Sequence, residues 1–182
     1  RYFCHAEGLH GIAHAVAFAQ KKKLPLFILG GGTNILFNDK IFKGLVLKPD
    51  IRFISVTSAL PETVTVICGA GVSVHDLLVM CAAEGFSGLE WAGGLPGTVG
   101  GAVRGNAGAF GGEIKDSIMS VEALDDTLTL RTFDNTSSDF SYRNSIFKQK
   151  NWVVLSASVK LAKGDKKALQ EISTSHCCSR LR

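Results

Sequence analysis

The spacing of apolar residues along the chain predicts two helices in its first half. Residues 8–23 carry apolar residues three and four positions apart and end in three lysines, which suit the carboxyl end of a helix dipole. Residues 73–84 give the clearer pattern, because an apolar stripe accompanies the capping-box spacing of Ser73 and Asp76. Gly85 follows directly and can end this helix with a positive φ.

Short apolar or alternating segments predict strands over much of the remaining chain. Glycine, proline and other turn-forming residues separate these segments, and DDTLTLRTF at 125–133 indicates a turn into a hairpin partner. The predicted strands are residues 26–29, 44–49, 63–71, 118–124, 127–133 and 152–161. Strands outnumber helices and do not alternate strictly with them, which favours an α+β fold over a doubly wound parallel sheet.

Composition indicates one globular domain that can bury a sizeable core. The chain has 182 residues, of which 46% are hydrophobic and 20% are charged. The net charge is +4, but apart from Lys21, Lys22 and Lys23 the basic residues are scattered, so no nucleic-acid partner is expected. No apolar run approaches the ~18 residues of a membrane helix, and no signal peptide is apparent.

The cysteines indicate a reducing compartment, which we expect to be the cytoplasm. Their number, five, is odd and no Cys-x-x-Cys pair occurs, so we expect neither a disulfide framework nor a metal site. Cys68 and Cys81 fall among apolar residues, as is typical of small buried side chains. The chain opens with Arg1 in place of Met, from which we expect a fragment or a processed product.

A first glycine segment follows the strand predicted at 26–29 without a break. It consists of Gly30, Gly31, Gly32, Thr33 and Asn34. Glycines let backbone N–H groups turn toward an anion, so a phosphate cradle is one interpretation, and a tight turn is an equally good one. The dinucleotide fingerprint G-x-G-x-x-G is excluded because Ile35 occupies its third glycine position, and no Gly-Lys-Ser/Thr follows for a P-loop.

A second glycine segment, GGLPGTVGGAVRGNAGAFGG at residues 93–112, contains nine glycines in twenty residues. Flexible linkers are usually polar, but this segment carries Leu95, Val99, Val103 and Phe110. We therefore expect a compact loop whose main chain lies against a flat or charged ligand. The two glycine segments, about sixty residues apart, would together bind one elongated dinucleotide.

Three motifs occur along the chain in this order: LGGGTNILFND, GLEWAGGLPGTVGGAVRGNAGAFGGEI and YRNSIFK. Together they resemble the FAD-binding half of the UDP-N-acetylenolpyruvoylglucosamine reductase (MurB) family, over roughly residues 3–162. The resemblance implies a two-subdomain FAD-binding fold of the vanillyl-alcohol-oxidase (PCMH) type, without the family's C-terminal substrate domain. It also implies subdomains at about 1–60 and 61–162, followed by an atypical or truncated tail at 163–182.

The resemblance also assigns roles to residues of these motifs. It implies that FAD contacts Gly30, Gly31, Gly32, Thr33, Asn34, Gly97, Thr98, Gly100, Gly101, Asn106, Ala107, Gly112, Glu113 and Ile114. It implies that Arg143 is a catalytic-site arginine and that Tyr142 and Lys148 bind substrate or brace the site. A guanidinium can bind a carboxylate through two hydrogen bonds and stabilise developing enolate charge. Without the motif, Arg143 is more typical of a surface salt bridge, and Tyr142 and Lys148 are equally typical of a core aromatic and a solvated lysine.

The family's reaction supplies the expected function. The resemblance implies an FAD-dependent NADPH oxidoreductase that converts the UDP-sugar UDP-N-acetylglucosamine enolpyruvate to UDP-N-acetylmuramate, in peptidoglycan precursor synthesis. That role would connect the chain to cell wall biogenesis, cell shape and cell division, and it implies a cytoplasmic monomer with no membrane partner. Two alternatives stay open: a truncated FAD-binding module without full turnover, and another FAD-dependent oxidoreductase of the same fold.

Beyond residue 162 the sequence departs from the family. The family continues into a substrate domain that supplies a serine proton donor and a late glutamate, and the segment after Leu161 matches neither. We therefore do not expect this chain alone to protonate or anchor the substrate. Trp91 and Arg104 are also unusual residues for the wall of a cofactor site.

Overall fold

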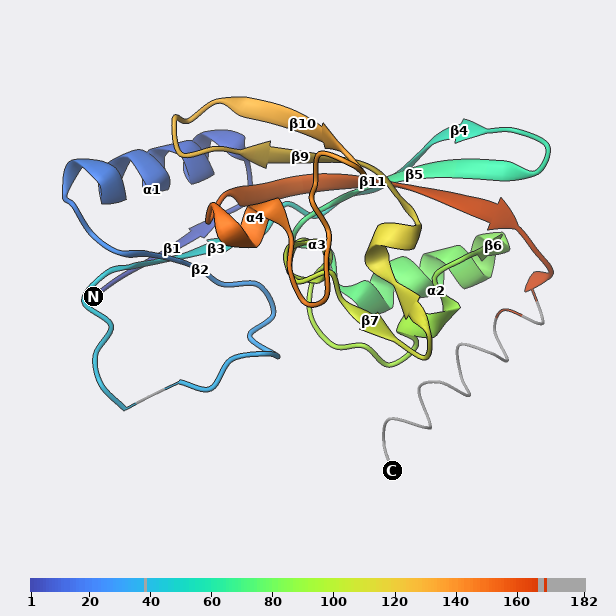
Figure 1. Cartoon of the computed structure of the whole chain (residues 1–182), viewed down its shortest axis with the longest axis horizontal. Helices are drawn as coiled ribbons and strands as arrows, with labels where there is room; N and C mark the ends of the chain where they lie inside the picture. Colours follow the sequence, from blue (N-terminus) through green and yellow to red (C-terminus); the bar gives the residue numbers. More distant parts are fainter. Residues whose placement is uncertain (38, 167–168, 170–182) are drawn as a thin grey trace.

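The computed structural model describes residues 1–37, 39–166 and 169, and its strands form two main sheets and a two-stranded ribbon (Figure 1). The smaller main sheet is parallel, with the order β1-β3-β2. Its strands are β1 (Tyr2–Ala6), β2 (Leu26–Ile28) and β3 (Leu45–Pro49). Helix α1 (Leu9–Lys21) connects β1 to β2, which confirms the helix predicted within 8–23.

Helix α1 joins the smaller sheet to the larger one. Its buried stripe recurs at helical spacing because one face of the helix packs inward. The core around this stripe contains Ala6, Ile12, Ala15, Val16, Ala19, Leu45, Leu47, Leu124, Val153 and Leu155. Since Leu124, Val153 and Leu155 belong to the larger sheet, this core fastens the two sheets together.

The larger sheet is antiparallel and is built around β11, its longest strand (Figure 1). The strand order is β10-β9-β11-β5-β4, and β6 pairs with the outer end of β11. The strands are β4 (Ile54–Ala59), β5 (Thr63–Gly69), β6 (Phe86–Ser87), β9 (Ile118–Leu124), β10 (Leu130–Asp134) and β11 (Val153–Lys163). The pairing of β9 with β10 confirms the hairpin predicted from DDTLTLRTF.

Helix α2 (Val74–Glu84) packs against the other face of the larger sheet. On β9, for example, Ala123 belongs to the core beneath α2, whereas the neighbouring Leu124 belongs to the core beneath α1. The predicted ends of this helix are confirmed. Ser73 Oγ accepts a hydrogen bond from the Asp76 N–H at 2.9 Å, and Gly85 has a φ of +75°.

The connections between these elements contain several short structures. They are η1 (Glu90–Ala92), α3 (Val99–Arg104), β7 (Gly108–Ala109), β8 (Gly112–Glu113), η2 (Ile114–Asp116) and α4 (Ile146–Gln149). The expectation of a loop throughout 93–112 is therefore wrong where α3 forms. Thr98 caps α3 by accepting from the Gly101 N–H at 3.3 Å, and the Gly100 N–H donates to the Ala70 carbonyl at 2.9 Å. These contacts outweigh the poor helix propensity of glycine.

The sequence analysis missed strands β1 and β4. Side chains in both are mostly exposed, and the alternation of β4 is confined to its first four residues. Both strands are held by backbone pairing with a more regular neighbour. The chain passes from the smaller to the larger sheet between Pro49 and Ile54, so β4 pairs in the larger sheet. The division into subdomains near residue 60 stays a prediction, and most of the predicted tail at 163–182 lies outside the described residues.

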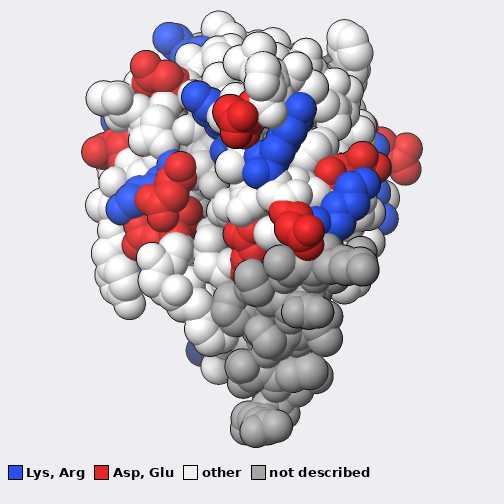
Figure 2. Space-filling view, turned by 90° about the vertical axis from the view of Figure 1, so that its right-hand side faces the viewer, with Lys and Arg blue, Asp and Glu red and all other residues white. Residues whose placement is uncertain are grey.

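The combination of one parallel and one antiparallel sheet, with helices that do not alternate strictly with strands, confirms the α+β class. Cys68 and Cys81 are buried, and burial raises the pKa of each thiol to about 12. On the described part of the face in Figure 2, basic and acidic side chains are interspersed and no broad patch has one sign. Within the described residues, no helix has the length and apolar character needed to cross a membrane.

Candidate functional site

The two glycine segments, far apart in the sequence, come into direct contact in the fold. A Cβ built on Gly31 would lie 2.8 Å from the Gly97 Cα, which is closer than real Cβ atoms approach other atoms. The Thr33 hydroxyl donates to the Pro96 carbonyl at 3.3 Å and adds a polar link beside this contact. The main chains of the two segments therefore meet at a place where no side chain fits.

Local geometry explains why glycine occurs in both segments. Gly32 has a φ of +74° and Gly97 a φ of +113°, which residues with a Cβ rarely adopt. Gly100 lies against Ala70, and a Cβ on Gly100 would lie 2.7 Å from the Ala70 Cβ. The glycines thus serve turn conformation at some positions and close approach at others.

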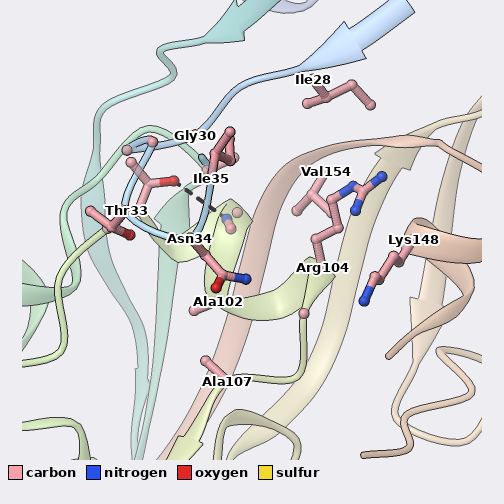
Figure 3. A pocket seen from close by; sticks show the side chains of 18 of the residues that line it. Ile28, Gly30, Thr33, Asn34, Ile35, Ala102, Arg104, Ala107, Lys148 and Val154 are labelled. Carbon is pink, nitrogen blue, oxygen red and sulfur yellow. Dashed lines mark hydrogen bonds between the residues drawn. The ribbon is translucent and has the colours of Figure 1, made fainter. Parts of the chain in front are cut away.

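A cavity of about 570 Å³ opens at the contact between the glycine segments (Figure 3). Its volume is typical of a site for a small molecule or cofactor. It lies between the two sheets, because Ile28 and Pro49 of the smaller sheet and Val154 of β11 line it. The predicted site residues that line it are Gly30, Gly31, Gly32, Thr33, Asn34, Gly97, Thr98, Gly100, Gly101, Ala107, Arg143 and Lys148.

The other predicted site residues do not line this cavity: they are Asn106, Gly112, Glu113, Ile114 and Tyr142. Asn106 is buried, with a φ of +41°, and its amide donates to Glu113 Oε2 at 3.1 Å and to the Ser141 carbonyl at 3.0 Å. The Glu113 carboxylate also pairs with Lys115, and this hydrogen bond lowers the pKa of Glu113. This cluster therefore braces the segment that carries Arg143, while its contact with a cofactor stays a prediction.

Arg143 occupies a strained position in a tight turn. Ser141 and Asn144 exchange two backbone hydrogen bonds of 3.1 Å, which leaves Tyr142 and Arg143 at the centre of the turn. Arg143 has a φ of +55°, a conformation for which such turns favour glycine or asparagine. Lys148 Nζ donates to the Arg143 carbonyl at 2.8 Å and holds the turn from the other side. Strain of this kind collects at functional sites, where surrounding contacts enforce it.

The cavity is lined by cations and, among the described residues, by no carboxylate. Besides Arg143 and Lys148, the lining includes Arg104, which the sequence analysis noted as unusual but did not assign to the site. Burial lowers the pKa of the Arg104 guanidinium, since burial opposes the charged form. Asn151 and Trp152 also line the cavity, and no local sequence signal distinguishes them.

FAD is a long molecule that is flat at one end and carries two negative charges on its diphosphate, so it needs both close main-chain approach and anion-binding groups. The cavity combines exposed main chain from two glycine segments, into which a Cβ would intrude, with cationic side chains. Backbone N–H groups of this kind bind phosphate oxygens. The residues therefore fit a dinucleotide cofactor.

Comparison with known proteins agrees with this geometry. A family model described as an FAD binding domain matches residues 2–134. The chain is 36% identical over 166 residues to a UDP-N-acetylenolpyruvoylglucosamine reductase of Caldanaerobacter subterraneus subsp. tengcongensis, covering 89% of the chain and 54% of the relative. It is 40% identical over 154 residues to the reductase of the same name from Gloeobacter violaceus, covering 85% and 51%. The chain thus spans about half the length of these curated relatives.

Solved structures give the same picture at the level of the fold. The UDP-N-acetylenolpyruvylglucosamine reductase (MurB) of Thermus caldophilus superposes with a TM-score of 0.79 at 26% identity, covering 98% of this chain and 62% of that one. A VAO-type flavoprotein of Myceliophthora thermophila superposes with a TM-score of 0.68 at 19% identity, covering 87% and 31%. The second likeness concerns the fold alone, and it confirms the predicted FAD-binding fold of the vanillyl-alcohol-oxidase type.

Proposed function

We propose that this chain serves the NADPH-dependent reduction of an enolpyruvyl UDP-sugar. The chain belongs to the FAD-binding domain family and corresponds to the FAD-binding part of the MurB reductases. The product would be UDP-N-acetylmuramate, and the process peptidoglycan precursor synthesis. We also propose that the chain acts in the cytoplasm as a monomer, with roles in cell wall biogenesis, cell shape and cell division.

The observation that carries the proposal is the contact between the glycine segments beside Arg143. Gly31 and Gly97 approach so closely that a Cβ on Gly31 would clash with the Gly97 main chain. The cavity at this contact is also lined by Arg143. A cofactor site and a strained arginine thus share one cavity. A turn or a linker would require neither feature.

The proposed cofactor contacts follow from the cavity. Main-chain N–H groups of Gly30–Asn34 and of Gly97 and Thr98 would hold the FAD diphosphate. The Gly100 and Gly101 N–H groups already donate to the Ala70 carbonyl and to Thr98 Oγ, so these two glycines would contribute close approach of the main chain. Ala107 lies further along the same wall, with a small side chain that leaves room for a flat ring. Bound FAD would supply hydride transfer between NADPH and the substrate double bond.

Arg143 and Lys148 would act on the substrate side of the site. The Arg143 guanidinium would bind the enolpyruvyl carboxylate with two hydrogen bonds and stabilise the negative charge that develops there. Lys148 would keep the Arg143 main chain in its left-handed conformation through the 2.8 Å hydrogen bond to its carbonyl. Tyr142 is 86% exposed, so a substrate contact by Tyr142 would have to be made at the rim.

A second candidate function is an FAD-binding module without turnover. It is favoured by the observation that the chain spans about half the length of its relatives. Among the described residues that line the cavity, only Thr33 and Thr98 carry a hydroxyl group, and both belong to the glycine segments. We propose neither of them as the proton donor of the reduction.

Two measurements on the purified chain test these proposals. An absorbance spectrum with flavin bands is expected, and a colourless chain that takes up no added FAD would remove both candidates. NADPH oxidation is then followed with and without the enolpyruvyl UDP-sugar. Oxidation that depends on the sugar supports the reductase, whereas a yellow chain whose NADPH oxidation ignores the sugar supports the binding module.

A further inference from the structure

Arg104 carries a charge in the cavity that the described residues leave without a counter-ion. Its Nη2 donates to Asn151 Oδ1 at 3.1 Å, while its Nε is buried and has no hydrogen-bond acceptor. None of the ion pairs among the described residues includes Arg104. A half-buried guanidinium whose buried Nε–H has no acceptor is costly unless a ligand completes its hydrogen bonds.

The position of Arg104 relates it to both glycine segments. It follows Gly101 by three residues on α3, so the two residues share a face of that helix, and both line the cavity. Figure 3 shows the side chain extending from α3 in the direction of Ile28 and Val154. Ile28 ends β2, two residues before Gly30, where the first glycine segment begins. Arg104 thus lines the cavity from α3, the helix formed by the second glycine segment.

We propose that Arg104 binds the diphosphate of FAD, as a side-chain donor in addition to the glycine main chain. The diphosphate carries the formal negative charges of oxidised FAD, and a guanidinium matches phosphate oxygens with two parallel N–H groups. The cavity offers no carboxylate from the described residues to compete for this role. The inference rests on the cofactor part of the proposed function and is independent of which substrate is reduced.

The runner-up role for Arg104 is a link between the sheets. Asn151, which accepts from Arg104, donates through its Nδ2 to the Leu26 carbonyl of β2 at 3.3 Å. If this link were the whole role of Arg104, removal of Asn151 would weaken FAD binding as much as removal of Arg104. The two roles therefore make different predictions.

The test is a titration of the flavin-free chain with FAD, ADP, adenosine and riboflavin. Arg104→Met keeps an unbranched apolar stem but removes the charge, and we expect roughly 10- to 100-fold weaker binding of both FAD and ADP, the range of a charge-assisted hydrogen bond. Adenosine and riboflavin lack phosphate and should bind as they do to the parent chain. The loss should shrink between about 0.01 M and about 1 M salt, as the Debye length falls from about 30 Å to about 3 Å.

Three further variants complete the design. Arg52→Met removes the same charge from a residue that does not line the cavity, and it should bind ADP like the parent. Asn151→Ala should retain most of the ADP affinity. Arg104→Lys keeps the charge without the planar fork, so its ADP affinity should fall between parent and Arg104→Met, and it serves if circular dichroism shows Arg104→Met to be unfolded.

Several outcomes would overturn the inference. Unchanged ADP affinity in Arg104→Met, or in Arg104→Lys if only that variant folds, removes the contact. Equal losses for adenosine and ADP, or a loss for riboflavin alone, move the contact to another part of FAD, and equal losses in Asn151→Ala favour the link. A chain that binds FAD through Arg104 but never reduces the sugar favours the binding module over the reductase and leaves this inference standing.

Discussion

Gly31→Ala tests the contact on which the cofactor site depends. The added Cβ would lie 2.8 Å from the Gly97 Cα, 3.4 Å from its carbonyl carbon and 3.6 Å from the Thr98 nitrogen. All three are backbone atoms, so no side chain can rotate away to make room. Ordinary contact begins near 3.4 Å, and the two segments would therefore have to separate by about 0.6 Å at this point.

The energetic consequence follows from the size of that separation. Forcing an extra methyl group into a closely packed site costs about 1–3 kcal/mol. If the segments relieve the clash by moving apart, this cost falls on the geometry that holds the diphosphate. At 1.4 kcal/mol for each factor of ten, we expect FAD to bind roughly 5- to 150-fold more weakly.

The assay is a fluorescence titration of the flavin-free chain with FAD, paired with thermal unfolding in the presence and absence of FAD. Gly105→Ala is the matched control, because Gly105 also lines the cavity but its Cβ would meet the nearest atom, the Gly101 carbonyl oxygen, at 3.5 Å. The control should bind FAD within a few-fold of the parent chain. Equal FAD affinity in Gly31→Ala and the parent would refute the reasoning that close main-chain approach builds the site.

Three other changes probe the turn, the hairpin and the helix cap. Arg143→Ala should leave FAD bound but reduce sugar reduction by roughly 100-fold or more in a complete enzyme that contains this segment; an unchanged rate would remove Arg143 from the reaction. Asp125 is buried and accepts from Thr127, Thr129 and Arg131, and these hydrogen bonds outweigh the opposing effect of burial and hold the pKa of its carboxyl far below 3.8. Since the folded-state pKa is depressed, this stabilisation is present above pH 3.8 and is lost as pH falls below it. Asp125→Asn should therefore have a lower melting temperature at pH 7, and its melting temperature should fall less steeply in acid. Identical melting curves for the variant and the parent would contradict this. Ser73→Ala should lower the free energy of unfolding by about 1 kcal/mol in urea titrations, because α2 loses its N-cap, and no change in midpoint would argue against a stabilising cap.

The regular elements could be predicted because their signals are local. Ser73, the apolar stripe and Gly85 predict helix α2, and each of these signals acts within a few residues. Strands such as β5 and β11 alternate or run apolar because one or both faces are buried. Strand β1 carries no such alternation, and pairing with the distant strand β3 decides its conformation, whereas the mostly exposed β4 is held by its hairpin neighbour β5. Helix α3 was taken for a loop because its glycine-rich sequence has a poor helix propensity, and its contact with Ala70 comes from a distant part of the chain.

The candidate site divides in a similar way. The motifs identified the glycine segments and Arg143, and with them the FAD-binding domain. This was possible because the bare main chain of glycine and the charge of arginine are properties of the residue types and do not depend on the fold. The order of the residues did not show that Asn106 would bond to Glu113 and to the Ser141 carbonyl and so brace the segment of Arg143. Nor did it show the environment of Arg104, which depends on residues from α3, β2 and β11 that converge only after folding.

By itself the sequence determined the two long helices α1 and α2, most of the longer strands, the α+β class and the residues able to present bare main chain to a phosphate. Tertiary structure alone decided that Gly31 meets Gly97, that the cavity opens between the two sheets, and that the Arg143 backbone is held in a left-handed turn. The physical reason is range: propensity and periodicity act over a few neighbours along the chain, whereas close approach, burial and unpaired charge arise between residues that only packing brings together.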